Sequence, residues 1–218
     1  MGGDPANANI TASILFLWSM LTAFLAMGML PTIVIERPVT YREMYDGLFS
    51  PVTYVAYKLV EELVPQIVAG IIYSVLVYFL INLQGSFLVF WLVYLVSTFN
   101  AVTSTMMVSA ASVNTSAAGA LMSSYATTLF FFSGFLIPFS KIPVYWRWYS
   151  VIDHLRYAFG AMMANQFSGN DPELFAGQTV LQYYDLQNVN AWAWLGFELL
   201  FFPVFIILFW AALKWIRY

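Results

Sequence analysis

The sequence predicts an all-α protein that crosses a membrane several times, and composition, charge spacing and hydrophobic pattern all support this fold class. Of the 218 residues, 61% are hydrophobic and only 9% are charged, whereas soluble domains carry roughly 25% charged residues. No charge occurs between Asp4 and Glu36, or between Glu62 and Lys141. The second gap far exceeds the roughly 20 apolar residues that span a bilayer. The apolar runs are continuous rather than alternating, which predicts helices instead of strands.

The apolar runs predict about five transmembrane helices. Short polar turns at residues 82–85 and 114–116 separate the second, third and fourth of them, and Lys214 and Arg217 suit the C-terminal end of the last. Each run is long enough to cross a hydrocarbon core about 30 Å thick at about 1.5 Å per residue. The predicted spans cover about residues 10–35, 63–83, 86–112, 117–137 and 195–215.

A charged segment, residues 36–62, follows the first predicted span. Within it, four apolar or aromatic residues fall at positions i, i+3, i+4 and i+7, which places them on one helical face. This spacing predicts a short amphipathic helix at the membrane surface, and it fits both an ordinary interfacial helix and a helix that docks a partner. The four residues are Tyr41, Met44, Tyr45 and Leu48.

The long segment 138–194 connects the last two predicted spans. An amphipathic stretch, residues 151–167, is too apolar for a free loop, so we expect the segment to dip partly into the membrane interface. Clustered tryptophan and tyrosine side chains are typical of such an interface. The cluster comprises Tyr145, Trp146, Trp148 and Tyr149.

Lysine and arginine counts predict the orientation. With five spans and a cytoplasmic C-terminus, the N-terminus lies outside, and the cytoplasmic side holds Arg37, Arg42, Lys58, Lys214 and Arg217. The outer side holds Lys141, Arg147 and Arg156. The excess on the cytoplasmic side agrees with the positive-inside rule.

Several function classes find no support in the sequence. There is no cysteine, so thiol nucleophiles and thiolate metal sites are excluded, and no basic patch for nucleic acid is present. No Walker A, zinc-protease or nucleophile-elbow pattern occurs. We therefore expect no catalytic, cofactor or metal site. His154 has no evident metal partners, Asp153 and Arg156 suit an exposed pair, and Glu198 is close enough to the end of a span to reach headgroup water.

Small and hydroxylated residues are frequent in the third and fourth predicted spans. Such residues allow helices to approach closely and to hydrogen-bond across their interface. Packing is therefore the default interpretation. Ser123 and Thr127, four residues apart on one face, could alternatively line a substrate path.

Four stretches in sequence order resemble the membrane domain of G-type ABC transporters, the family of pleiotropic drug resistance pumps and of multidrug and sterol half-transporters. They cover nearly the whole chain. The family's first span and its nucleotide-binding domain have no counterpart here, and an Asn-Pro pair common in the family is replaced by Asp153-His154. The stretches are residues 36–43 with their continuation to Pro65, residues 132–138, residues 142–148 with 156–158 and 165–167, and the last span.

The resemblance implies particular roles for individual residues. The segment from Tyr41 to Leu48 would be a cytoplasmic coupling helix that rests on a nucleotide-binding domain. Phe24 would stack against flat hydrophobic substrates in a central cavity between two such membrane domains. Residues that would line this cavity from the fourth span are Ser123, Thr127 and Phe130, and residues that would form an apolar plug toward the outer exit are Phe135 and Leu136.

The expected function is that of the membrane domain of an ATP-driven exporter of lipophilic or amphipathic molecules, working by alternating access, most commonly in the plasma membrane. ATP and Mg²⁺ would bind the nucleotide-binding domain, so the chain would not be an enzyme by itself. Its partners would be the lipid bilayer, that domain, an identical or different second membrane domain, and the substrate. The alternatives are a truncated fragment, a non-transporting scaffold and, with least support, an intramembrane enzyme.

Overall fold

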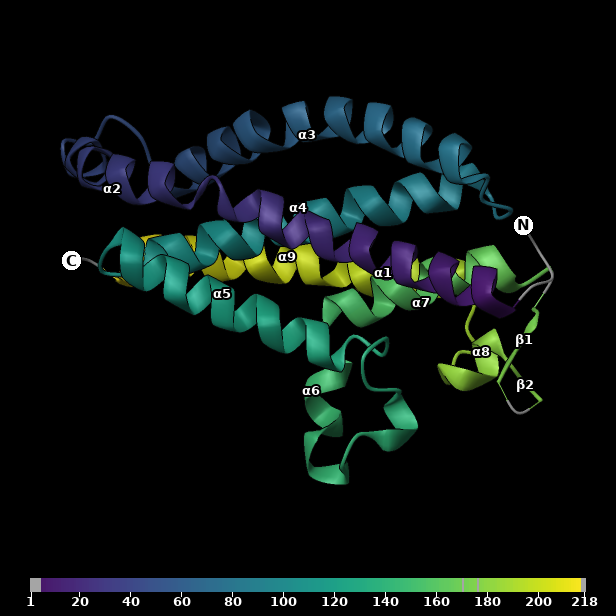
Figure 1. Cartoon of the computed structure of the whole chain (residues 1–218). Coiled ribbons are helices and arrows are strands. Elements are labelled where there is room, and N and C mark those ends of the chain that lie inside the picture. Colours follow the sequence, from purple (N-terminus) through teal and green to yellow (C-terminus); the bar gives the residue numbers. More distant parts are fainter. Residues whose placement is uncertain (1–4, 170, 176, 217–218) are drawn as a thin grey trace.

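The computed structural model describes residues 5–169, 171–175 and 177–216, and its main helices run roughly side by side as an elongated bundle (Figure 1). Arg217, which contributed to the predicted orientation, lies outside these residues. The long helices are α1 (Pro5–Met27), α2 (Leu30–Tyr45), α3 (Pro51–Ile81), α4 (Phe87–Ala111), α5 (Thr115–Phe132) and α9 (Ala191–Trp215). The segment before α9 holds η1 (Phe139–Lys141), η2 (Val144–Trp146), α6 (Arg147–Val151), α7 (His154–Phe167), β1 (Glu173–Phe175), β2 (Gln178–Thr179) and α8 (Val180–Tyr183).

The predicted fold class is confirmed. Within the described residues, four helical stretches are long and apolar enough to cross a membrane: residues 7–45, 51–81, 87–111 and 191–215. The predicted fourth span, 117–137, corresponds to α5, which ends at Phe132 and is not among the four. Serine and threonine residues lower the hydropathy of α5, so its sequence is less apolar than that of its neighbours.

The helical stretch from α1 to α2 differs from the sequence-based expectation. The break falls at Gly28 and Met29, whose N–H groups bond to the carbonyls three residues earlier. Pro31, in the first turn of α2, suits a helix start because proline needs no donor there. Helix α2 then continues through Pro38 and ends where Gly47 adopts a φ of +75°. Tyr41, Met44 and Tyr45 therefore lie on the last turns of α2, not on a separate helix, and Leu48 follows it.

Helix α3 begins earlier than predicted and packs loosely. Ser50 caps it by accepting a hydrogen bond from the Thr53 N–H at 3.3 Å, and Pro51 occupies its first turn. Lys58, which was expected in the surface segment, is therefore part of α3. Only 11% of the most apolar window of α3 is buried, against 67% for α4. Figure 1 shows α3 arching along the outside of the bundle, with Pro65 inside the helix as a cause of bending.

Helix α4 is the centre of the bundle and contacts α1, α2, α3, α5, α7 and α9. Most of its hydroxyl groups bond to carbonyls of the preceding turn, as Thr98 does to Tyr94 at 2.8 Å and Ser109 to Thr105 at 2.7 Å. These bonds satisfy the hydroxyl groups within the helix and leave small side chains at the interfaces. The predicted packing role of these residues on α4 agrees with their burial.

Helix α7 packs into the bundle, whereas the apolar stretch at residues 151–167 predicted a segment that dips partly into the membrane interface. It packs against α1, α4 and α9, and nearly all of its first eleven residues are buried. Asp153 caps it by accepting from the Leu155 N–H at 2.9 Å. Gly160 lies against the Trp194 ring of α9 so closely that a Cβ atom would overlap the indole.

We predict that Gly160→Ala lowers the thermal stability of the purified chain in lipid nanodiscs by several degrees. Overpacking of this kind costs about 1–3 kcal/mol, and about 1 kcal/mol corresponds to roughly 2–4 °C at this chain length. Gly119→Ala is the matched control, because no atom lies within 4 Å of its Cβ position. An unchanged melting temperature for Gly160→Ala would contradict the close packing of α7 on α9.

Candidate functional site

The first candidate site is the surface formed by α1 and α5. The rings of Phe24 on α1 and Phe130 on α5 lie with their centroids 5.4 Å apart. Phe24 is 47% exposed, whereas Phe130 turns into the core, where its ring contacts Phe16. The structure thus brings two of the four predicted cavity residues together, with one available to a ligand.

Ser123 and Thr127 lie on the exposed side of α5. The Thr127 hydroxyl donates to the Ser123 carbonyl at 2.7 Å. This bond satisfies the hydroxyl group within the helix, so the methyl group of Thr127 adds apolar surface to the exposed side. Thr128, also exposed, shares a hydrogen bond of 2.5 Å with the Tyr149 hydroxyl. The exposed side of α5 therefore presents short polar side chains, and neither α1 nor α5 carries a charged residue within its bounds. The exposed part of Phe24 borders a shallow pocket that Val77 and Ile81 of α3 also line.

The two predicted plug residues have different environments. Phe135 is half-buried, with its ring stacked on Phe16 at 4.4 Å and on Tyr184 at 5.7 Å, and edge-on to Phe159 at 5.6 Å. Leu136, the next residue, is exposed. Phe135 therefore fixes the end of α5 to α1 and α7, and Leu136 is the member available to an adjacent molecule.

The predicted coupling residues also divide into two pairs. The Tyr41 hydroxyl donates to the Ile216 carbonyl at 2.8 Å, and Met44 packs on the same apolar cluster near the end of α9. Tyr45 is 87% exposed and Leu48 is exposed beyond the helix. Only Tyr45 and Leu48 are thus free to contact a partner, while the other two hold the end of α2 against α9.

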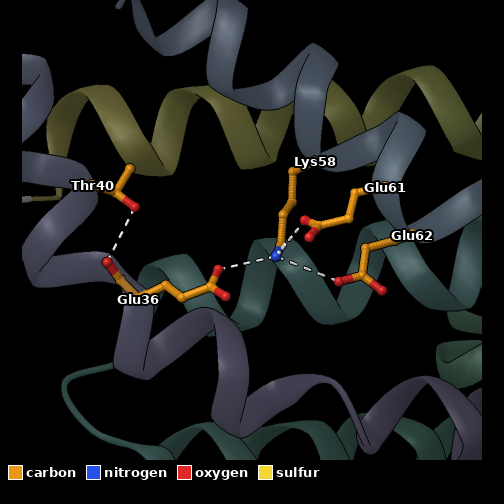
Figure 2. Close-up of polar contacts among 5 residues, drawn as sticks. All are labelled: Glu36, Thr40, Lys58, Glu61 and Glu62. Carbon is orange, nitrogen blue, oxygen red and sulfur yellow. Dashed lines mark hydrogen bonds and ion pairs between the residues drawn. The ribbon is translucent and has the colours of Figure 1, made fainter. Parts of the chain in front are cut away.

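An ion cluster around a buried lysine connects α2 with α3 (Figure 2). The Lys58 side chain points from α3 toward Glu36 on α2, with 3.0 Å between Nζ and Oε2 of Glu36. Its Nζ also lies 2.8 Å from Oε2 of Glu61 and 3.5 Å from Oε1 of Glu62. Lys58 is 1% exposed, so its ammonium group depends on these carboxylates for the interactions that water would otherwise provide.

Arg37, the neighbour of Glu36, connects α2 with α4. Its guanidinium donates to the carbonyls of Ser109 and Ala110 at 3.3 Å and of Val113 at 3.0 Å, and also to that of Ser112. These carbonyls lie at the C-terminal end of α4, where helices leave acceptors unpaired and favour a positive charge. Glu36 and Arg37 thus bind α2 to two different helices.

The sequence contained a partial signal for this junction. Lys58, Glu61 and Glu62 have the i, i+3, i+4 spacing of helical ion pairs. Recognising it required placing residues 51–62 in the helix, whereas the prediction began the span at 63. The partner Glu36 and the α4 carbonyls come from distant segments, and only the tertiary structure brings them together.

Two expectations for ionisable residues were wrong. Asp153 and His154 are buried, not on an exposed loop, and Arg156 lies over the rings of Phe139 at 4.1 Å and Trp194 at 5.6 Å. Burial raises the pKa of Asp153 and lowers the pKa of His154 to about 4, so both favour their neutral forms. Glu198 is fully buried and bonded to Ser97 instead of reaching headgroup water.

The bundle is apolar, its α1–α5 face is uncharged, and charged residues gather at the junction of α2 with α3 and α4. These features define a polytopic membrane protein with a charged junction at one end. Residues 3–167 match the ABC-2 type transporter family, and the chain belongs to this family. Within the described residues, no group of three acidic or histidine side chains could hold a metal ion.

Relatives of this chain are long G-family and drug-resistance transporters. The chain is 33% identical over 147 residues to ABC transporter G family member 40 of Oryza sativa subsp. japonica, covering 66% of this chain and 10% of the relative. It is 31% identical over 192 residues to family member 37 of the same organism, with coverages of 82% and 13%. It is 30% identical over 158 residues to pleiotropic drug resistance protein 1 of Petunia hybrida, with coverages of 71% and 11%. The chain thus spans only a small part of each relative.

We predict that Lys58→Met lowers the free energy of unfolding at neutral pH by about 2 kcal/mol, the scale of a lost hydrogen bond to a charged group. The substitution keeps the apolar stem and leaves three carboxylates facing one another. Glu36→Gln in the same chain should recover part of the loss, which a double-mutant cycle by chemical unfolding measures. Strictly additive effects of the two substitutions would contradict the ion pair across α2 and α3.

Proposed function

We propose that this chain forms the membrane domain of an ATP-driven exporter of lipophilic or amphipathic small molecules. The observation that carries the proposal is the uncharged surface of α1 and α5, on which Phe24, Ser123 and Thr127 are exposed, in a chain of the ABC-2 type transporter family. An aromatic, uncharged surface favours flat apolar ligands through burial and ring stacking. A second membrane domain facing this surface would enclose it as a central cavity.

The motor in this proposal is a nucleotide-binding domain that binds ATP and Mg²⁺ and contacts Tyr45 and Leu48, so hydrolysis takes place outside this chain. When the nucleotide-binding domain moves, this contact would move α2 as a rigid element. From α2 the movement would pass to α3 through Glu36 and Lys58, to α4 through Arg37, and to α9 through Tyr41. In the alternating-access cycle that follows, the substrate passes Phe135 and Leu136 on its way out. The end of the bundle that holds Tyr45 and the described C-terminus (Figure 1) is then cytoplasmic, and the plasma membrane is the expected location.

We expect Tyr45→Asp to abolish the stimulation of ATPase activity by lipophilic compounds in a complex purified with its nucleotide-binding domain. A buried carboxylate at an interface is costly unless it is paired, so the contact would be lost while the exposed position spares the fold. Tyr45→Phe is the control and should retain stimulation. Full stimulation in Tyr45→Asp would argue against docking at this end of α2, and no copurified partner would favour a non-transporting fragment or scaffold.

We expect Phe24→Ala to raise the KM for a flat aromatic substrate by up to about tenfold with little change in kcat. An aromatic pair contributes about 0.5–1.5 kcal/mol, and about 1.4 kcal/mol corresponds to a tenfold change in affinity. Phe79→Ala on α3 is the matched control, because Phe79 is also exposed but lies on another surface. Equal effects of the two substitutions on substrate-stimulated ATPase activity would exclude a specific role for Phe24.

A further inference from the structure

The interface between α4 and α9 is the most extensive helix contact in the described part of the chain, and it contains a carboxyl group. Glu198, on the second turn of α9, has no exposed surface. It faces Ser97 and Asn100 of α4, which are also fully buried. An ionised side chain inside a membrane bundle costs free energy and is usually paired with another polar or charged group.

The hydrogen bonds around Glu198 leave two acceptors without a donor. The Ser97 hydroxyl donates to Oε1 of Glu198 at 2.5 Å, and the Asn100 side-chain amide donates to the Glu198 carbonyl at 2.9 Å. Oε2 of Glu198 and Oδ1 of Asn100 are buried and have no hydrogen-bond partner among the described residues. An ionised carboxylate can only accept hydrogen bonds, so an ionised Glu198 would leave both oxygens unsatisfied.

No cation in the described residues compensates a charge on Glu198. Helix α4 has no charged residue, and its Tyr94 is neutral in ordinary conditions. On α3, Lys58 is held by its three glutamates, one turn from Tyr54, whose ring contacts Phe209. Phe209 is 11 residues beyond Glu198 in the same helix, which is roughly 16 Å along the axis at about 1.5 Å per residue.

The groups of α7 that face α9 do not supply a charge either. The His154 ring lies 6.2 Å from Phe201 and 6.1 Å from Phe205, and it is buried in its neutral form. Arg156 lies over aromatic rings, and its electrostatic partners are Asp153, Tyr157 and Asp185. Among the residues that the structure describes, Glu198 is therefore surrounded by uncharged groups, and the Ser97 hydroxyl is its only side-chain donor.

We propose that Glu198 is a proton-binding site, whose carboxyl group carries a proton at neutral pH and donates through Oε2. The bound ligand is a single proton, which a hydronium ion of the bulk solvent supplies, leaving one water molecule and an uncharged carboxyl group. One proton cancels the buried charge and converts Oε2, an acceptor without a donor, into a donor group. Loss of this proton would place a negative charge in the middle of the α4–α9 interface and weaken it. The inference is independent of the transport proposal.

The test is infrared spectroscopy of the whole chain in lipid nanodiscs at neutral pH. A protonated carboxyl group gives a carbonyl stretching band that an ionised carboxylate lacks, and the band shifts on exchange into D₂O. Glu198→Gln identifies the band, and Asp153→Asn is the control for the other buried acid. We expect one band that is lost in Glu198→Gln and kept in Asp153→Asn. Absence of a Glu198 band in the wild-type chain overturns the proposal.

Thermal stability provides the second measurement. Gln resembles the protonated acid in shape and charge, so Glu198→Gln should melt close to the wild-type chain at neutral pH. Glu198→Ala should melt several degrees lower, because it leaves a cavity and strands Ser97. If Glu198→Gln does not fold, its melting temperature cannot support the proposal. The carboxyl band of the Ser97→Ala variant then decides whether Glu198 is the protonated group. Removal of the Ser97 hydroxyl must shift the carboxyl band, and an unshifted band overturns the proposal.

Discussion

The adjacent opposite charges of Glu36 and Arg37 fix how the three helices at one end of the bundle meet. Glu36 pairs with a lysine of α3, and Arg37 binds the carbonyls that end α4. Each contact gives a partner to a group of the other helix that would otherwise lack one. In α3 this group is the buried ammonium of the lysine, and in α4 it is the set of unpaired carbonyl oxygens. Two consecutive side chains of α2 point to different helices, so α2 cannot shift along its axis without breaking both contacts.

Elsewhere the bundle tolerates polar groups by keeping them uncharged or locally bonded. Most of the hydroxyl groups of α4 bond to their own helix, which allows α7 and α9 to pack closely on small side chains. Asp153 uses its carboxyl group to cap α7. The polar side chains thus position the helices, whereas apolar packing supplies most of the contact.

Much of the fold was predictable from the sequence, because a bilayer requires long apolar segments without charge, and such segments are visible in the sequence. The apolar character of residues 154–167 showed that they are not a free loop, but it did not show that they pack against α1, α4 and α9. The residues at which the helices begin and end were less predictable. The first span was predicted to end at residue 35, but α2 continues to Tyr45 through Pro38. Lys58 and Glu61 suggested a surface segment, although they lie in α3. Local charge cannot show whether a side chain meets a partner from another helix.

The candidate site was predictable only in part for a similar reason. The spacing of Tyr41, Met44, Tyr45 and Leu48 placed them on one face, but it could not show that α9 already covers the first two. Likewise, resemblance grouped Phe135 with Leu136, whereas the turn after α5 sends these neighbours in different directions. Exposure is a property of the assembled bundle, so the residues left for partners emerge only from the structure.

The length and loose packing of α3 have a consequence for the response to lipid. Its 31 residues extend roughly 46 Å at about 1.5 Å per residue, against a hydrocarbon core about 30 Å thick. Only 11% of its most apolar window is buried against protein, so in a bilayer a change in thickness would alter its tilt and its bend at Pro65 at little cost to the other helices. Lys58 lies two turns before that proline and is anchored to Glu36. Membrane thickness is thereby mechanically connected to the position of α2.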